Sequence, residues 1–194
     1  MSMTPEDAWR EEAYDRMVEE VLETHREQIV EEFVAARMAS YYRQNPDLSA
    51  AAERMLDEAI RLLKISPSAS LVFSYAAIEI TLKNVLLKPV AFGMIHDELT
   101  GPLITDLVIN NRQFTKLLFQ VLREYGFDIT TQKRQGSSIS LWEEMKDLRT
   151  LRNGVVHSGE PTSNEQAALS LRYAKFLLHK LYPQVRALII GENT

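Results

Sequence analysis

The C-terminal part of the chain carries a seven-residue repeat of apolar side chains. The repeat alternates steps of four and three residues and consists of Ala167, Leu171, Ala174, Leu178, Leu181, Val185 and Leu188. On an α-helix this spacing places every member on one continuous seam, which is stable in water only when other helices cover it. The repeat therefore predicts a long helix, beginning at Ser163 or Asn164, that packs lengthwise in a bundle.

Residues 66–88 form a second segment, which is apolar nearly all round. One helical stripe consists of Leu71, Tyr75, Ile78, Leu82 and Val85, and the other side is lined by Val72, Ala76, Ile80 and Leu87. A helix with so little polar surface belongs at the centre of a bundle. We expect it to end before Pro89, because the residue before a proline disfavours helical geometry. Glu79 is an unusual carboxylate inside this segment.

The remaining helices are predicted from capping residues, breakers and apolar stripes. They cover residues 4–46, 50–65, 103–108, 114–125 and 140–157, with Ser138 or Ser140 as the cap of the last. The first is acidic and amphipathic, with a stripe that passes through Ile29, Phe33 and Ala36. No segment alternates apolar and polar residues as a strand does, and 7 Gly and 7 Pro leave little room for a turn-rich β architecture. The chain is therefore predicted to be all-α.

Charge divides the chain into an acidic arm and a mildly basic body. Residues 1–60 contain 6 Lys/Arg and 15 Asp/Glu, a net charge of −9, whereas residues 61–194 contain 16 and 12, a net charge of +4. We predict an acidic amphipathic arm over 1–48 and a helical bundle over 49–194, with a helical and loop insertion over 89–136. The body can accept a phosphate backbone, although the acidity of the arm is also what a solvated helix shows.

Several classes of site are not indicated. The chain has no Cys, and therefore no disulfide or cysteine–zinc site. His96, Asp97 and Glu98 cannot converge on one ion, because adjacent helical residues point about 100° apart. There is no phosphate-binding Gly loop, Gly-x-Ser-x-Gly elbow or His-Glu-x-x-His pair. Without a signal peptide or a long apolar run, we expect a cytoplasmic protein that needs no membrane and no cofactor.

The remaining chemical signal is Arg152-Asn153-Gly154-Val155-Val156-His157, at the end of a predicted helix. A break at Ser158-Gly159-Glu160-Pro161 follows, then the heptad helix, and the apolar helix with its carboxylate lies upstream. This arrangement, over residues 50–190, resembles the HEPN superfamily, which is marked by an Arg, a polar residue and, a few positions later, a His. The resemblance implies a HEPN-like up-and-down helical bundle. The arm and the insertion lie outside it.

The resemblance also implies an activity and partners. HEPN proteins are commonly metal-independent ribonucleases that act as dimers, often in toxin–antitoxin or phage-defence systems. Others are catalytically silent modules that bind RNA, a nucleotide or a partner protein. By resemblance, Arg152 and His157 are the catalytic pair and Asn153 orients them, whereas Gly159 replaces a Tyr that some members carry. The expected partners are a second copy of the chain, an RNA substrate and an antitoxin or nucleotidyltransferase.

These residue types suit RNA cleavage. RNA supplies its own nucleophile, the 2′-hydroxyl, so the enzyme must move protons and neutralise the phosphate. His157 titrates near neutral pH and can act as base or acid, while Arg152 offers phosphate oxygens a planar fork of donors. One His cannot readily serve as both base and acid, which favours two copies across a two-fold axis. Alternatively, both residues only stabilise the helix C-terminus through its dipole.

Arg152 is predicted to have a specific neighbour. On a helix from Leu141, Arg152 falls on the apolar face, whereas Arg149 and Asn153 lie to the side; that face consists of Leu141, Met145, Leu148, Arg152 and Val155. An unpaired charge among apolar side chains costs about 3–5 kcal/mol. Glu79 is the natural partner. We therefore predict that Arg152 and Glu79 make contact, with Glu79 and Arg149 in supporting roles.

Overall fold

A computed structural model of the protein describes residues 16, 26–94 and 112–191 of the 194 in the chain. All regular structure in these residues is helical and none of them forms a strand, which confirms the all-α prediction. The helices are α2 (Arg26–Gln44), α3 (Ala50–Leu62), α4 (Pro67–Ile80), α5 (Lys88–Met94), α7 (Arg112–Glu124), α8 (Leu141–Ser158), α9 (Asn164–Phe176) and α10 (Tyr182–Ile190). The first part of the predicted arm, the expected helix at 103–108 and the residues His96, Asp97 and Glu98 lie outside the described residues.

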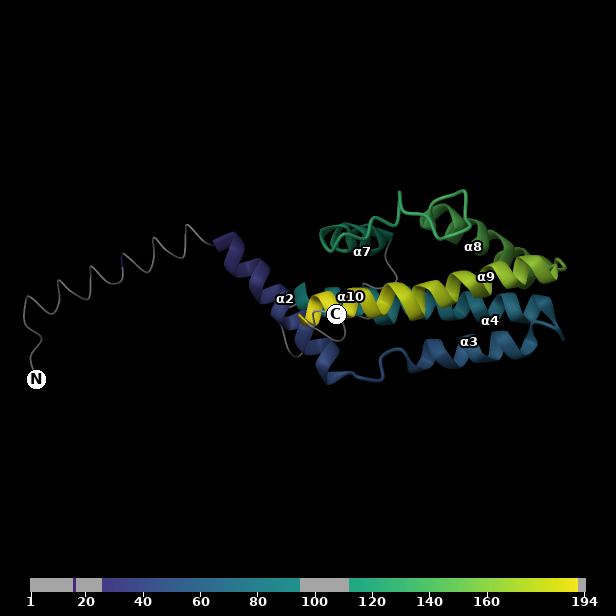
Figure 1. Ribbon diagram of the computed structural model, residues 1–194, viewed down its shortest axis with the longest axis horizontal. Helices are drawn as coiled ribbons and strands as arrows, with labels where there is room; N and C mark the ends of the chain where they lie inside the picture. Colours follow the sequence, from purple (N-terminus) through teal and green to yellow (C-terminus); the bar gives the residue numbers. More distant parts are fainter. Residues whose placement is uncertain (1–15, 17–25, 95–111, 192–194) are drawn as a thin grey trace, which may run out of the picture.

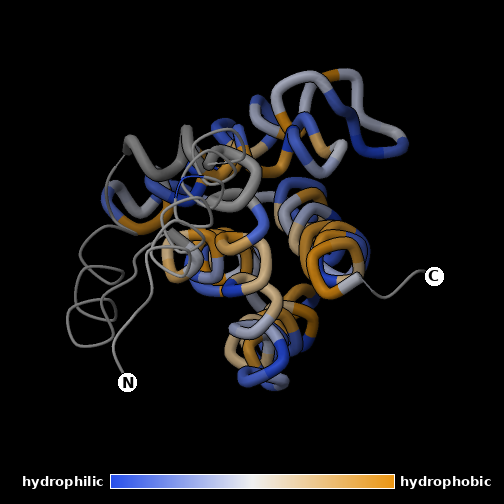
Figure 2. The backbone as a smooth tube through the Cα atoms, turned by 90° about the vertical axis from the view of Figure 1, so that its left-hand side faces the viewer, coloured by the Kyte–Doolittle hydropathy of each residue, from blue (hydrophilic) through white to orange (hydrophobic). Residues whose placement is uncertain are grey.

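The helices form an elongated bundle along α4. α3 and α9 lie beside α4, α2 crosses one end of the bundle near α10, and α7 and α8 cover another side (Figure 1). Seen along the long axis, apolar residues are concentrated in the helices of the middle and hydrophilic residues lie mostly on their outer sides (Figure 2). Ala59, Leu71, Ile78 and Ala167 are completely buried where α3, α4 and α9 meet. The predicted central position of α4 is confirmed.

The central helix does not end at Pro89, and the prediction on this point is wrong. A π-helical stretch, η1 (Thr81–Leu87), connects α4 directly to α5, and Pro89 lies inside α5. In a regular α-helix the proline ring would crowd the carbonyl four residues earlier, that of Val85, and would give it no N–H. The wider winding of η1 precedes the proline. The Tyr42 hydroxyl of α2 donates to the Val85 carbonyl at 3.0 Å and supplies a donor.

The segment Pro67–Gly93, taken as one helix, is long and apolar enough to cross a membrane by length and composition. Its most apolar window has a mean hydropathy of 1.4, and 56% of that window is buried inside the bundle. The sequence was predicted to contain no such run, and by this measure one is present among the described residues. The central helix of a bundle meets the same criterion because other helices cover it.

The C-terminal helix contains a second π-helical stretch, and its buried seam departs from the predicted repeat only at the last position. This stretch, η2 (Leu177–Leu181), joins α9 to α10, and Pro183 follows close behind. Six of the seven predicted seam residues are buried, but Leu188 is 53% exposed and Ile189 is buried in its place. Val185, beyond η2, keeps its predicted buried position, so the departure from the repeat is confined to the last turn of α10.

α2 packs on the body through a face that differs from the predicted stripe. Met38, Ala39 and Tyr42 are buried in the core, where α2 meets α5 and α10, whereas Phe33 and Ala36 are exposed. This part of the arm joins the body, as expected, but the stripe is wrong at those two positions. α2 carries apolar residues on more than one face, so periodicity alone cannot select the face that becomes covered.

α3 is shorter than predicted. It ends at Leu62, and Ile65 is exposed. The chain turns after Leu62 so that Ser66 can cap α4, and the Ser66 hydroxyl accepts from the Ala69 N–H at 3.4 Å. The cap of α4 therefore lies directly after the last apolar residue of the pattern that predicts α3, and it ends α3 early.

Replacing Tyr42 by Phe should destabilise the protein by about 1–3 kcal/mol, because the buried Val85 carbonyl then loses this donor. In a Pro89→Ala background, where residue 89 regains an N–H, the same substitution should cost less. Urea denaturation of the four proteins, followed by circular dichroism, measures the coupling between the two sites. Equal losses in both backgrounds would show that the hydroxyl does not compensate for the proline.

Candidate functional site

α8 carries the motif, and local hydrogen bonds fix both of its ends. At its start the Ser140 hydroxyl accepts from the Glu143 N–H at 3.2 Å, and the Glu143 carboxylate accepts from the Ser140 N–H at 3.1 Å. The bond from the Ser140 N–H is the main reason that the pKa of Glu143 is lowered. At its end Gly159 is left-handed, with φ of 66°. The predicted cap at Ser140 and stop at Gly159 are confirmed.

A buried ion pair fastens the polar loop before α8 to α8 itself. Arg134 Nη2 lies 2.5 Å from Glu144 Oε1, and the two side chains are only 11% and 2% exposed. Arg134 Nε and Glu144 Oε2 have no hydrogen-bond partner in the structure. Because both charges are held away from water, removal of either partner leaves the other unpaired in the core. Sequence reasoning missed this pair, since Arg134 lies in a loop and has no periodicity to place it beside Glu144.

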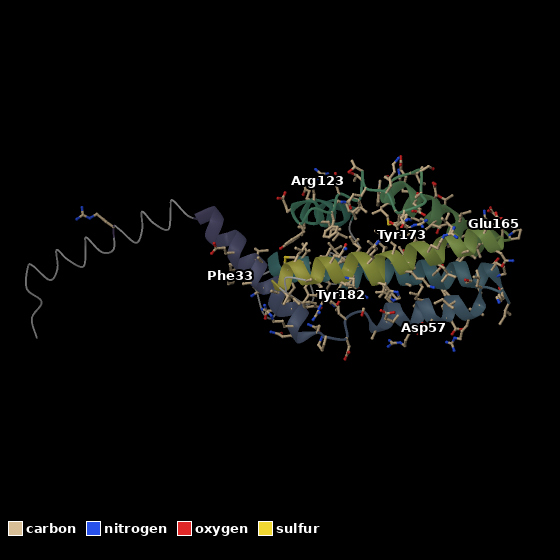
Figure 3. The ribbon with its side chains drawn as sticks, viewed as in Figure 1. Phe33, Asp57, Arg123, Glu165, Tyr173 and Tyr182 are labelled. Atoms are coloured by element: carbon tan, nitrogen blue, oxygen red, sulfur yellow. The ribbon has the colours of Figure 1, made fainter. Side chains whose placement is uncertain are left out.

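Two further hydrogen bonds seat α8 on the bundle. The Tyr173 hydroxyl of α9 (Figure 3) donates to the Leu141 carbonyl at 2.7 Å, at the first residue of α8. Beyond the last turn, the Thr162 N–H donates to the Ser68 hydroxyl of α4 at 3.2 Å. α8 is therefore attached to α9 at one end and, through the following loop, to α4 at the other.

Arg152 is held between α8 and α4 by three contacts. Its Nη2 lies 3.8 Å from Glu79 Oε2, its Nη1 donates to Asn153 Oδ1 at 3.0 Å, and its guanidinium carbon lies 5.7 Å from the centre of the Tyr75 ring. The predicted contact between Arg152 and Glu79 is confirmed. The burial assumed for it is not, because the two side chains are 31% and 38% exposed. A partly solvated pair of this kind contributes about 0–1 kcal/mol.

Tyr75 belongs to this site, although its spacing in the sequence predicts only a place in the core stripe. It lies in α4, one turn before Glu79, and is 3% exposed. Burial and then the negative charge of Glu79 raise the pKa of Tyr75 to about 12, while the positive charges of Arg149 and Arg152 act in the opposite direction. Tyr75, Glu79, Arg149 and Arg152 thus form one electrostatic group, the α4–α8 cluster. The i, i+4 spacing of Tyr75 and Glu79 was the available signal.

His157 lies in the last turn of α8 and is exposed. In the part of the chain that the structure describes, no hydrogen bond or ion pair engages it, and no contact joins it to Arg152. Residues five apart on a helix point about 140° away from each other, whereas Asn153, four residues before His157, shares its side. The structure brings Arg152, Asn153 and Glu79 together and leaves His157 apart from them.

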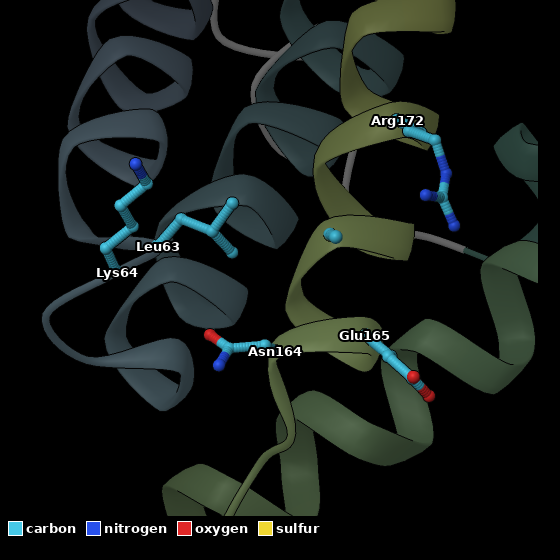
Figure 4. A pocket seen from close by; sticks show the side chains of 6 residues that line it. Leu63, Lys64, Asn164, Glu165 and Arg172 are labelled. Carbon is cyan, nitrogen blue, oxygen red and sulfur yellow. The ribbon is translucent and has the colours of Figure 1, made fainter.

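A groove elsewhere on the surface contains no motif residue. It has a volume of about 610 Å³ between the end of α3 and the start of α9, and it is lined by Leu63, Lys64, Asn164, Glu165, Ala168 and Arg172. Glu165 and Arg172 point away from Leu63 and Lys64, so its charged groups do not converge (Figure 4). Over residues 26–94 and 112–191, no three His, Asp or Glu side chains lie close enough together to hold a metal ion.

Replacing Glu144 by Gln should destabilise the protein by about 3–5 kcal/mol, because the buried Arg134 then lacks its counter-charge. The double replacement Arg134→Met, Glu144→Leu should recover most of that loss, since it removes both charges. Glu58→Gln is the matched control: its partner Arg61 is largely exposed, so the change should cost less than about 1 kcal/mol. Urea denaturation measures all of these. A double variant as unstable as the single one would contradict the argument.

Comparisons of this chain with protein-family models, with curated proteins and with solved structures found no match.

Proposed function

We propose that the chain is a HEPN-like endoribonuclease that cleaves RNA by attack of the 2′-hydroxyl, without a metal ion. The arrangement at the end of α8 supports this proposal. The Arg152 guanidinium is oriented by Asn153 and Glu79, and one turn farther on His157 presents an exposed ring. The cytoplasmic role of a toxin or phage-defence effector, paired with an antitoxin or nucleotidyltransferase, is part of the proposal and rests on the resemblance alone.

In the proposed reaction the 2′-oxygen attacks the adjacent phosphorus, and the bond from phosphorus to the 5′-oxygen of the next nucleotide breaks. One group must take the 2′-hydroxyl proton, and another must give a proton to the departing 5′-oxygen. The His157 imidazole suits either role near neutral pH. Arg152 donates to the phosphate oxygens and offsets the charge that develops there. The products end in a 2′,3′-cyclic phosphate and a 5′-hydroxyl.

The reaction needs two proton-transfer groups, and the motif of one chain supplies one His. Because Arg152 and His157 of one helix point about 140° apart, a second chain across a two-fold axis is the simplest source of the other imidazole. Val156 is exposed beside His157 and gives the end of α8 an apolar contact point. We therefore include a homodimer in the proposal, with the α8 ends near the axis.

A catalytically silent module that binds RNA, a nucleotide or a partner protein is the second candidate. The position of Glu79 favours this second candidate, because the Glu79 carboxylate offsets the charge of Arg152 in the free protein. The separation of 3.8 Å nevertheless exceeds that of a charge-assisted hydrogen bond, about 2.7–2.9 Å, so a phosphate can displace the carboxylate. Both candidates allow RNA to bind at Arg152, and cleavage separates them.

The purified protein should cleave RNA to products with a 2′,3′-cyclic phosphate and leave DNA intact, because DNA lacks the 2′-hydroxyl. Cleavage should persist in chelator, since the nucleophile belongs to the substrate. His157→Ala should lose about a hundredfold to ten-thousandfold in rate. Arg152→Lys should be severely impaired, because a point charge does not replace a planar fork. Gel assays and mass spectrometry of the product ends measure these effects.

Arg61→Lys is the matched control for Arg152→Lys, since it makes the same chemical change on an exposed residue of α3. It should cleave RNA as the wild type does. The nuclease proposal is rejected if the wild type leaves varied RNAs intact or if His157→Ala cleaves equally well. Intact RNA together with retained RNA binding would support the silent module.

Light scattering at micromolar concentration should return twice the mass of one chain. The interface of such a dimer should bury roughly 1,200–2,000 Å² in total. Val156→Asp should shift the mass toward one chain and lower the cleavage rate with it, because a charge in an apolar contact is poorly tolerated. A wild-type mass equal to that of one chain would remove the dimer from the proposal.

A further inference from the structure

The Tyr75 hydroxyl is a polar group of the α4–α8 cluster to which the fold assigns no partner. Tyr75 is 3% exposed, and among the described residues none hydrogen-bonds its hydroxyl. In the same part of the chain, the side-chain polar atoms that are both fully buried and unpartnered are Arg134 Nε and Glu144 Oε2. The Tyr75 hydroxyl is not one of them, so it reaches the surface through the small exposed part of its side chain. It is therefore available to a ligand.

The charges of three groups act on this hydroxyl. The Arg152 guanidinium lies 5.7 Å from the ring centre, and Glu79 follows one turn later on α4. Glu79, Arg149 and Arg152 all lie close enough for their charges to act on the hydroxyl. Two guanidinium groups and one carboxylate leave one net positive charge beside a neutral hydrogen-bond donor.

We propose that Tyr75 is a substrate-binding residue and that the α4–α8 cluster takes the phosphodiester of a polynucleotide rather than a phosphate monoester. The hydroxyl donates to one phosphate oxygen while Arg149 and Arg152 bind the others. One net positive charge matches the single negative charge of a diester. A phosphate monoester carries a charge of about −1.5 to −2 near neutral pH, and its additional negative charge is repelled by the Glu79 carboxylate. The inference rests on the proposed RNA-directed function.

Tyr75 holds the phosphate and does not exchange protons. A pKa of about 12 keeps its hydroxyl protonated near neutral pH. The ring contributes separately, because it lies beneath the Arg152 guanidinium as a cation–π partner. Removing the hydroxyl alone should therefore raise KM for RNA and leave the pH midpoint of cleavage where it is.

The direct test is binding of a 2′-O-methyl oligoribonucleotide, which keeps its phosphodiesters but cannot be cleaved because its 2′-oxygens are blocked. Fluorescence anisotropy compares the wild type with Tyr75→Phe and Tyr182→Phe. Tyr182 is the matched control: it is buried in α10 (Figure 3), and its hydroxyl has no hydrogen-bond partner in the described chain. Tyr75→Phe should bind about threefold to tenfold more weakly, and Tyr182→Phe should bind as the wild type does.

A pair of small competitors tests the ligand class. A 2′-O-methyl dinucleoside phosphate, which has one diester, should displace the oligonucleotide better than a nucleoside 3′-monophosphate does. The inference is overturned if Tyr75→Phe binds as tightly as the wild type, if both Phe variants weaken equally, or if the monophosphate is the better competitor. Thermal unfolding of each variant shows that the fold is retained.

These outcomes separate Tyr75 from the nuclease proposal. Cleavage by the wild type, together with unchanged binding by Tyr75→Phe, rejects the role of Tyr75 and keeps the nuclease. Intact RNA, together with weaker binding by Tyr75→Phe, rejects the nuclease and supports the role of Tyr75. A wild type that does not bind the 2′-O-methyl oligonucleotide overturns the role of Tyr75.

Discussion

Pro89 removes a backbone donor from the central helix, and the packing of the bundle depends on how that loss is met. The Tyr42 hydroxyl reaches the Val85 carbonyl from α2, and the π-helical stretch η1 widens the path of the chain before the proline ring. The chain therefore continues from α4 into α5. Because α8 packs on α4 and α2 packs on α5, the helix that carries the motif and the helix of the arm are attached to one continuous element.

The parts of the fold that depend on neighbouring residues could be predicted from the sequence. The all-α class follows from the spacing of apolar residues. The start of α8 follows from Ser140 and its end from Gly159, because each of these features depends on residues within one or two helical turns. The contact between Arg152 and Glu79 could also be predicted from the sequence. A charge on an apolar face needs a partner, and the apolar helix offers one carboxylate for that purpose.

Features that depend on distant parts of the chain could not be predicted. A π-helical turn leaves no mark in a pattern of 3.6 residues, so the course of the chain past Pro89 was missed. Arg134 lies in a loop, where nothing in the local sequence points to its partner in α8. Tyr75 has the pattern of a core residue because its ring is buried, whereas two of the charges that act on its hydroxyl, those of Arg149 and Arg152, come from α8.

Glu79 gives Arg152 a resident counter-ion, so an anion can bind there only by exchange. The carboxylate is held on α4, 3.8 Å from the guanidinium, which gives it a high effective concentration there. A small anion that offers charge alone gains little by replacing it. A polymer of phosphates makes further contacts with each exchange and can outcompete it. At this pair, an anion that makes further contacts with the protein is therefore favoured over a simple ion of the same charge.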